Sequence, residues 1–263
     1  MKLFDTHSDY EDFVGGGGIL KPNVSHCVQE NEVHYKPIPN FNGHEYVDLG
    51  LPSGTLWATM NVGSESETDN GLYFAWGETE GYDIDQISGS ATPHRDFDWQ
   101  SYKLSDNATS ASSPNFIKYN TKSNYGVVDN IMRLELVDDA AHAYMGGDWK
   151  MPTSEQFDEL FSLDYIEFNP AAENYQGSGM ICSTFTNVNN GNVLVLPWAG
   201  SFNYGGNFYD AAYYWTSSLS EQSNTNYDCR NSYRFICNGD RWGASGVDYR
   251  IYGMTIRGVV SDT

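Results

Sequence analysis

The fold is decided by the stretch Tyr46-Val47-Asp48-Leu49-Gly50-Leu51-Pro52-Ser53-Gly54-Thr55-Leu56-Trp57-Ala58. Residues 46–49 alternate apolar and polar side chains as a half-buried strand does, and residues 55–60 continue with residues that favour strands. Leu51-Pro52-Ser53-Gly54, between these two segments, is typical of a turn. The stretch therefore predicts two hairpin-like strands that open a domain.

Further elements follow downstream. Residues 71–77, Gly-Leu-Tyr-Phe-Ala-Trp-Gly, are expected to form an aromatic strand, and the polar residues 80–124 to form mostly loop. A helix is predicted over 137–145, because acidic residues lie at its start and two glycines at its end. A second helix is predicted from Thr153, whose spacing to Gln156 is that of a capping box.

The last third of the chain reads as β structure. Residues 193–198 form an apolar run typical of a buried strand, and the rest alternates aromatic and polar residues between glycine-rich turns. We therefore expect an α+β fold with two short helices on twisted antiparallel sheets and long loops, over residues 41–263. Residues 1–40 contain a Gly15–Gly18 hinge and three prolines, and we interpret them as an N-terminal attachment or adapter segment.

Composition excludes several classes of partner. Lys and Arg number 14 against 35 Asp and Glu, so the formal charge of −21 repels nucleic acid and anionic membrane surfaces. No run approaches the roughly 20 apolar residues of a membrane span, and the N-terminus shows no signal-peptide h-region. Aromatic residues make up 15% of the chain, which favours a folded domain over disorder.

Several motifs together resemble a known family. Residues 46–58, Asn61-Val62-Gly63, Tyr73 to Glu78, Gly147 to Thr153, Tyr214 to Ser218 and Arg250 to Arg257 are similar to the Fibrobacter-type major paralogous domain. The resemblance covers roughly residues 41–260. It implies a surface protein of gut bacteria or their phages, with a C-type-lectin-like fold related to that of formylglycine-generating enzymes.

Proteins of this fold also serve as variable proteins of diversity-generating retroelements, which mutate adenines in a C-terminal repeat. Between Ser201 and Gly253, nearly half the residues are Asn, Tyr, Asp or Ser, and none is Lys. Changes at the adenines of an Asn codon interchange these four residues, so this use would leave such a bias. Tyr also offers large contact area at low entropic cost, while Asn and Ser offer adaptable hydrogen bonds.

The predicted ligand-binding surface therefore lies in this region. We expect it to consist of Asn203, Tyr204, Asn207, Tyr209, Asp210, Asn224, Asn226, Tyr227, Arg230, Arg241 and Trp242. Tyr213, Tyr214, Trp215 and Phe235 occupy strand-like or motif positions, and we expect these four to pack on the sheet.

No catalytic or cofactor signature is found in the sequence. The Glu-Pro-Asn, Gln-Pro-Asp and Trp-Asn-Asp motifs of calcium-dependent sugar lectins are missing, which favours a calcium-free mode and no cofactor. The six histidines show no i,i+4 pair, and no phosphate-binding glycine loop is found. Cys229 and Cys237 are close enough in sequence to bridge across a hairpin, or they are two free, partly buried thiols.

We expect a non-enzymatic, diversified receptor-binding protein, displayed on a phage tail or a bacterial surface, that binds a protein or glycan on a cell surface. The N-terminal segment would support homo-oligomer or particle assembly. One alternative is a bacterial adhesin of the same fold with a fixed ligand. The other is an enzyme of the formylglycine-generating type, although Cys229 and Cys237 do not match that family's motif.

Overall fold

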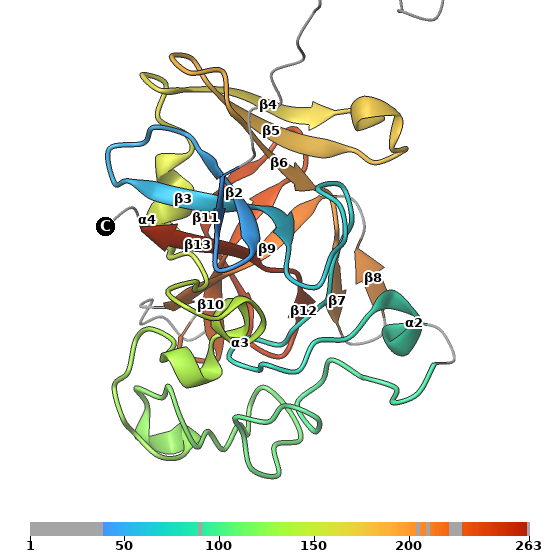
Figure 1. Cartoon of the computed structure of the whole chain (residues 1–263). Coiled ribbons are helices and arrows are strands. Elements are labelled where there is room, and N and C mark those ends of the chain that lie inside the picture. Colours follow the sequence, from blue (N-terminus) through green and yellow to red (C-terminus); the bar gives the residue numbers. More distant parts are fainter. Residues whose placement is uncertain (1–38, 89–90, 204–205, 209–210, 221–227, 262–263) are drawn as a thin grey trace, which may run out of the picture. The chain divides into compact units, whose positions relative to one another are not determined.

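Strand β3 (Thr55–Asn61) lies between β2 (His44–Asp48) and β13 (Arg257–Ser261), which joins the beginning and the end of the domain in one antiparallel sheet. A computed structural model (Figure 1) describes residues 39–88, 91–203, 206–208, 211–220 and 228–261, with the side chains of 206–208 excepted. The two strands predicted around residues 46–60 are confirmed. Thr55 to Ala58 are buried because β3 has a partner strand on each side and a core on each face.

Three further sheets complete the strand arrangement of the described residues, and the strands pair antiparallel in all of them. Strand β1 (Asn40–Phe41) extends the first sheet beside β2. The other sheets are β4 (Ile166–Ala172), β5 (Cys182–Asn187) and β6 (Val193–Pro197); β12 (Gly253–Met254), β7 (Ser201–Asn203) and β8 (Gly206–Phe208); and β11 (Trp242–Tyr249), β10 (Asn231–Cys237) and β9 (Ala212–Leu219).

Alternation along the strands separates two hydrophobic cores. The Trp76 core includes Trp76, Leu56 and Trp215, and the Phe157 core includes Phe157, Trp57 and Tyr214. Because successive side chains of a strand point to opposite faces, β3 and β9 each contribute to both cores. Each fully buried apolar side chain contributes roughly 1.5–3 kcal/mol to the free energy of unfolding. Because β3 and β9 place such side chains in both cores, the two cores stabilise each other.

The helices are short. Helix α3 (Ala140–Met145) begins at its N-cap Asp139 and ends at Gly146, so the predicted residues 137 and 138 belong instead to a 3-10 turn (Leu136–Asp138). Helix α4 (Ser154–Glu159) has the predicted capping box of Thr153 and Gln156. A third helix, α2 (Ile84–Ile87), was not predicted, and it has a capping box of its own at Asp83 and Gln86.

The aromatic run 71–77 was wrongly predicted as a strand. Only single bridges form there, from Tyr73 to Tyr82 and from Phe74 to Met254. Tyr73, Phe74 and Trp76 are nevertheless buried, because the run is an extended segment that lies within the Trp76 core and is not part of a sheet. The long segment that follows has little regular structure, as predicted, apart from α2 and a 3-10 turn at Ser123–Tyr125.

The chain divides into Met1–Pro37 and a larger unit, Ile38–Thr263, which holds all the elements above. The predicted attachment segment lies outside the described residues except for residues 39 and 40. The described structure is mixed, mostly β sheets with a few short helices, which is compatible with the predicted α+β class. No helix in the described part of the chain is long and apolar enough to cross a membrane.

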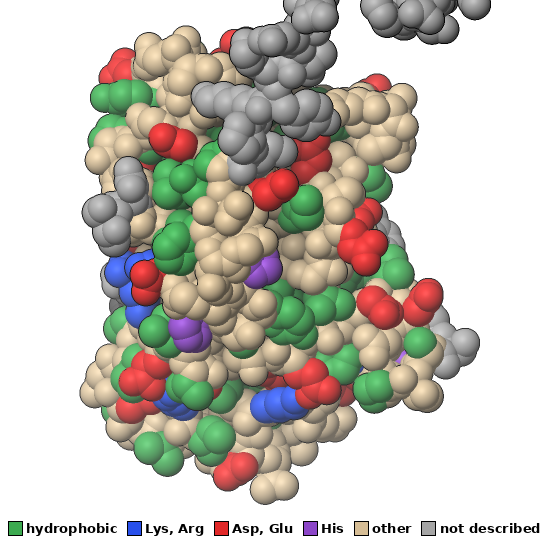
Figure 2. Space-filling model, viewed as in Figure 1, with side chains coloured by type: hydrophobic (Ala, Val, Ile, Leu, Met, Phe, Trp, Pro, Cys, Tyr) green, Lys and Arg blue, Asp and Glu red, His purple; other side chains and the backbone are tan. Residues whose placement is uncertain are grey.

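On the face drawn in Figure 2, acidic side chains are spread widely and basic ones are few.

Candidate functional site

The predicted site residues fall into three groups in the structure. Asn203 ends β7 and is half-buried, and Asn207 lies in β8, where only the backbone is described. Arg230 precedes β10, whereas Arg241 and Trp242 lie at the turn after it. The remaining predicted residues lie outside the described residues: Tyr204, Tyr209, Asp210, Asn224, Asn226 and Tyr227.

Arg230 has a supporting position in the structure. It is 9% exposed, and its Nε lies 2.8 Å from Oδ1 of Asp228. Its Nη1 donates to the carbonyl oxygen of Ala111, and its guanidinium lies 5.0 Å from the centroid of the Tyr125 ring. The side chain thus ties the start of β10 to the long loop, and it does not present a free guanidinium to a ligand.

Arg241 and Trp242 are exposed, as a contact surface requires. Trp242 is 50% exposed, and it pairs with Cys237 at the far end of β10 from Arg230. Strands rise about 3.3 Å per residue, so the seven residues of β10 separate the two by roughly 20 Å. The structure therefore does not bring Arg230 and Trp242 into one contact patch.

A second group of polar and aromatic residues was missed from the sequence. We call Tyr213, Arg234, Asp248 and Tyr252 the β-face cluster. Arg234 forms an ion pair with Asp248, and its guanidinium lies 5.3 Å from the centroid of the Tyr213 ring. Tyr213, Asp248 and Tyr252 are only partly buried, so the cluster reaches the surface of the β9–β10–β11 sheet.

The alternation of β10 could have identified this cluster. Phe235 is buried in the Phe157 core, so its neighbour Arg234 must lie on the opposite face of the sheet. Gly246 is the partner of Arg234 on β11, and a Cβ there would lie 2.4 Å from Nη1 of Arg234, so a larger residue would displace the guanidinium from its present position. Tyr214, Trp215 and Phe235 are fully buried, which confirms their predicted packing role, whereas Tyr213 is half-buried.

Tyr252 links the β-face cluster to the long loop. Burial, with a smaller effect from the negative charge of Asp248, raises the pKa of Tyr252 to about 12. Its hydroxyl therefore stays protonated and can donate a hydrogen bond. Its ring packs edge-on against Tyr249, with 5.9 Å between centroids. Tyr249 in turn packs against Trp99 of the loop at 5.7 Å. The loop thus supports the end of β11.

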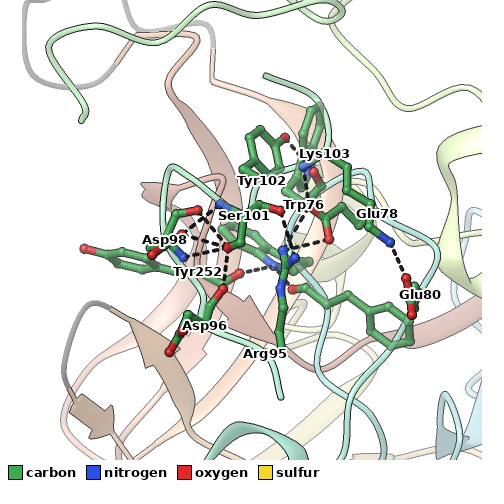
Figure 3. Close-up of polar contacts among 12 residues, drawn as sticks. Trp76, Glu78, Glu80, Arg95, Asp96, Asp98, Ser101, Tyr102, Lys103 and Tyr252 are labelled. Atoms are coloured by element: carbon green, nitrogen blue, oxygen red, sulfur yellow. Dashed lines mark hydrogen bonds and ion pairs between the residues drawn. The ribbon is translucent and has the colours of Figure 1, made fainter. Parts of the chain in front are cut away.

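A buried ion pair fixes this loop to the core (Figure 3). Arg95 and Glu78 are both nearly inaccessible, and Nη2 of Arg95 lies 3.0 and 2.8 Å from the two carboxylate oxygens. Burial raises the pKa of Glu78, although the charge of Arg95 and the backbone N–H of Lys103 oppose the shift. Nη1 of Arg95 also donates to the carbonyl oxygen of Ser101, which closes the loop.

Cys229 and Cys237 are separate from one another. Cys229 and Cys237 are free and buried, and they lie near the two ends of one strand instead of facing each other across a hairpin. Cys229 donates to the side-chain oxygen of Asn120, and Cys237 donates to the carbonyl oxygen of Pro170. Burial raises the pKa of Cys237, which disfavours a reactive thiolate at neutral pH.

Within the described ranges, no three His, Cys, Asp or Glu side chains are grouped so that they could hold an ion.

Comparisons with known proteins give no relative for this chain. No family model matches the sequence, and neither a curated protein nor a solved structure matches it significantly.

Proposed function

We propose that this chain is a non-enzymatic recognition protein with a C-type-lectin-like fold, whose C-terminal third binds a molecule on a cell surface. The observation that carries the proposal is that the β9–β10–β11 sheet is anchored in both cores and still brings polar and aromatic side chains to the surface. Phe235 lies in the Phe157 core and Trp215 in the Trp76 core, while Tyr213, Asp248 and Tyr252 of the β-face cluster remain partly exposed. A surface of this kind offers aromatic and hydrogen-bonding contacts with little loss of entropy on binding.

The supports beneath the surface favour a preorganised site. Arg230 and Asp228 tie the start of β10 to the long loop, the Glu78–Arg95 pair fixes that loop, and Trp99 of the loop packs against Tyr249 of β11. Binding to a surface that is already ordered costs less than ordering a loop at the moment of contact. The recognition mode is therefore shape and polar complementarity, with aromatic side chains as anchors.

A direct test is binding of the labelled chain to a panel of intact bacterial and host cells, followed by flow cytometry. Replacing Tyr252 or Asn203 with Ala is expected to reduce binding at least about tenfold, as loss of a contact anchor does. Leu163→Ser is the matched control, because Leu163 is 87% exposed and lies outside the C-terminal third. Unchanged binding of both alanine variants, at an unchanged melting temperature, would remove these residues from the surface.

Diversification by a retroelement is the finer part of the proposal. It predicts a reverse-transcriptase gene nearby and a near-copy of the sequence encoding residues 201–253. Sibling sequences should then differ mainly at the predicted Asn and Tyr positions. If the genome lacks both features, the fixed-ligand adhesin replaces the diversified protein.

The formylglycine-generating alternative requires reactive cysteines. Their separate, buried positions give no support to paired redox chemistry. Cys229→Ser and Cys237→Ser are expected to leave cell binding unaltered. Turnover of a cysteine-containing sulfatase peptide that both substitutions abolish would instead establish the enzyme.

A further inference from the structure

The turn between β10 and β11 carries exposed polar side chains beside one exposed indole ring and one half-buried indole ring. Trp242 is the most exposed tryptophan among the described residues. It is also the only exposed large hydrophobic residue that the described part of the chain has after Val193. Trp198, which is half-buried, lies next to the turn, with its ring edge 3.8 Å from the position of a Cβ on Gly239. We call Trp198, Trp242 and the turn Asn238–Arg241 the indole turn.

The ring of Trp242 is held in place while one part of it faces solvent. Phe168 of β4 packs against it edge-on, with 5.6 Å between centroids. Phe168 is itself stacked on the buried Phe185 at 4.8 Å. Trp198 is fixed separately, because its Nε1 donates to Oγ of Ser183 over 3.1 Å. Neither indole needs to be ordered when a ligand arrives.

The turn itself is polar and closed by internal hydrogen bonds. The side-chain oxygen of Asn238 accepts from the backbone N–H of Arg241, and the backbone N–H of Asn238 donates to the carbonyl oxygen of Arg241. Gly239 has a φ of +87°, a conformation that glycine adopts without strain. Asp240 and Arg241 are exposed and form no ion pair with another described residue, so both are available for hydrogen bonds.

We propose that the indole turn binds a neutral sugar ring, with Trp242 stacked on its C–H face and Asp240 and Arg241 hydrogen-bonded to its hydroxyl groups. This inference rests on the proposed recognition function and names the chemistry of its ligand. One exposed indole offers the apolar area of a single pyranose, which is far less than a protein interface requires. The charge of −21 disfavours polyanionic glycans. The oxygens and nitrogens of the turn would bind hydroxyl groups without calcium.

The experiment is binding of the full chain to an array of immobilised neutral and sialylated oligosaccharides, in EDTA and in calcium. We expect selective binding of neutral glycans, equal in both buffers. Trp242→Ala should reduce that binding at least about tenfold, while Trp242→Phe keeps part of it and Asp240→Ala reduces it. Leu163→Ser, at another exposed apolar site, should bind as the wild type does.

Two results would overturn the inference. One is no glycan binding by the wild type; the other is glycan binding that Trp242→Ala leaves unchanged at an unaltered melting temperature. Cell binding by the same preparation separates the two proposals. If cells are bound and Trp242→Ala has no effect, the sugar site fails and the recognition function stands. If neither cells nor glycans are bound, both fail.

Discussion

The guanidinium carbon of Arg250 lies 4.2 Å from the centroid of the Phe116 ring, inside a box that also contains the rings of Trp76 and Tyr102. Arg250 is fully buried. Its charge is balanced by carbonyl and hydroxyl oxygens: Nη1 donates to the carbonyls of Tyr119 and Cys229, Nη2 to that of Lys118, and Nε to the Tyr102 hydroxyl. Arg250, which directly follows β11, thus holds the long loop in place.

Arg250→Lys is expected to lower the free energy of unfolding by roughly 3 kcal/mol. An ammonium keeps the charge, but it cannot reach all four acceptors or stack on the rings as a planar guanidinium does. Urea denaturation followed by tryptophan fluorescence measures the change. Arg241→Lys is the matched control, because Arg241 is exposed, and it should shift stability by less than about 0.5 kcal/mol. Equal stability of the two variants would mean that the box does not hold the loop.

The Glu78–Arg95 pair should behave as a coupled unit. Arg95→Met leaves a buried carboxylate without its partner and is expected to cost roughly 3–5 kcal/mol. The double variant Glu78→Gln/Arg95→Met should recover part of that loss, giving a nonadditive cycle in urea denaturation. Lys103→Ala is the control, because the Lys103–Glu80 pair is half-exposed and should contribute less than about 1 kcal/mol.

The Glu78–Arg95 pair also predicts how the stability loss caused by Arg95→Met depends on pH. Burial already raises the pKa of Glu78 above 4.5, and removing Arg95 removes the main effect that opposes it. A raised carboxyl pKa favours the folded state at low pH, and that contribution is lost as pH rises through the folded-state pKa. Arg95→Met should therefore lower the free energy of unfolding less at pH 4 than at pH 8. An equal deficit at both pH values would show that Glu78 does not ionise against Arg95.

Local patterns predicted part of this fold. The alternation in residues 46–60 and the capping box at Thr153 were confirmed, because each depends on neighbours in sequence. The run 71–77 was misassigned for the opposite reason. Its rings are buried by residues far away, such as Met254 and Thr216, so apolar character alone could not distinguish a strand from an extended core segment.

The candidate site was predictable only in part. Composition pointed to the C-terminal third, where Trp242 is exposed and Arg230 is buried. The role of Arg230 was not visible, because its partners Ala111 and Tyr125 lie more than a hundred residues earlier in the chain. Arg234 and Asp248 were missed because the register between β10 and β11 brings them together, and no local motif encodes that register.

Helix α4 gives a test of the predicted capping box. Thr153→Ala removes the acceptor for the backbone N–H of Gln156 and should cost about 1 kcal/mol. The helix should still form, since Phe157 packs against Trp57 at 4.9 Å between centroids. Thermal unfolding monitored by circular dichroism measures the loss. Thr109→Ala, at an exposed loop position, is the comparison and should leave the melting temperature within error. A loss no larger than that of Thr109→Ala would contradict the role of the cap.

Asp129 should make part of the stability acid-sensitive. Although burial raises its pKa, hydrogen bonds from the backbone N–H groups of Ile131, Asn120 and Tyr119 outweigh burial and hold the pKa below the usual 3.8. A carboxyl with a lowered pKa stabilises the fold above its unfolded-state value, and the contribution is lost as pH falls below about 4. Asp129→Asn keeps the shape but accepts fewer hydrogen bonds, so it should lower stability at pH 7 by roughly 1–3 kcal/mol.

The difference between wild type and Asp129→Asn should then narrow as pH falls below about 4, because the wild-type carboxylate becomes protonated and loses the same interactions. Urea denaturation at pH 7, 5 and 3.5 follows this trend. Asp96→Asn is the control, since the Asp96 side chain is 74% exposed and is expected to show no such convergence. A constant difference between wild type and Asp129→Asn across the series would mean that the three N–H groups bind a neutral acceptor equally well, and the loop at residues 119–131 would then depend on shape and not on charge.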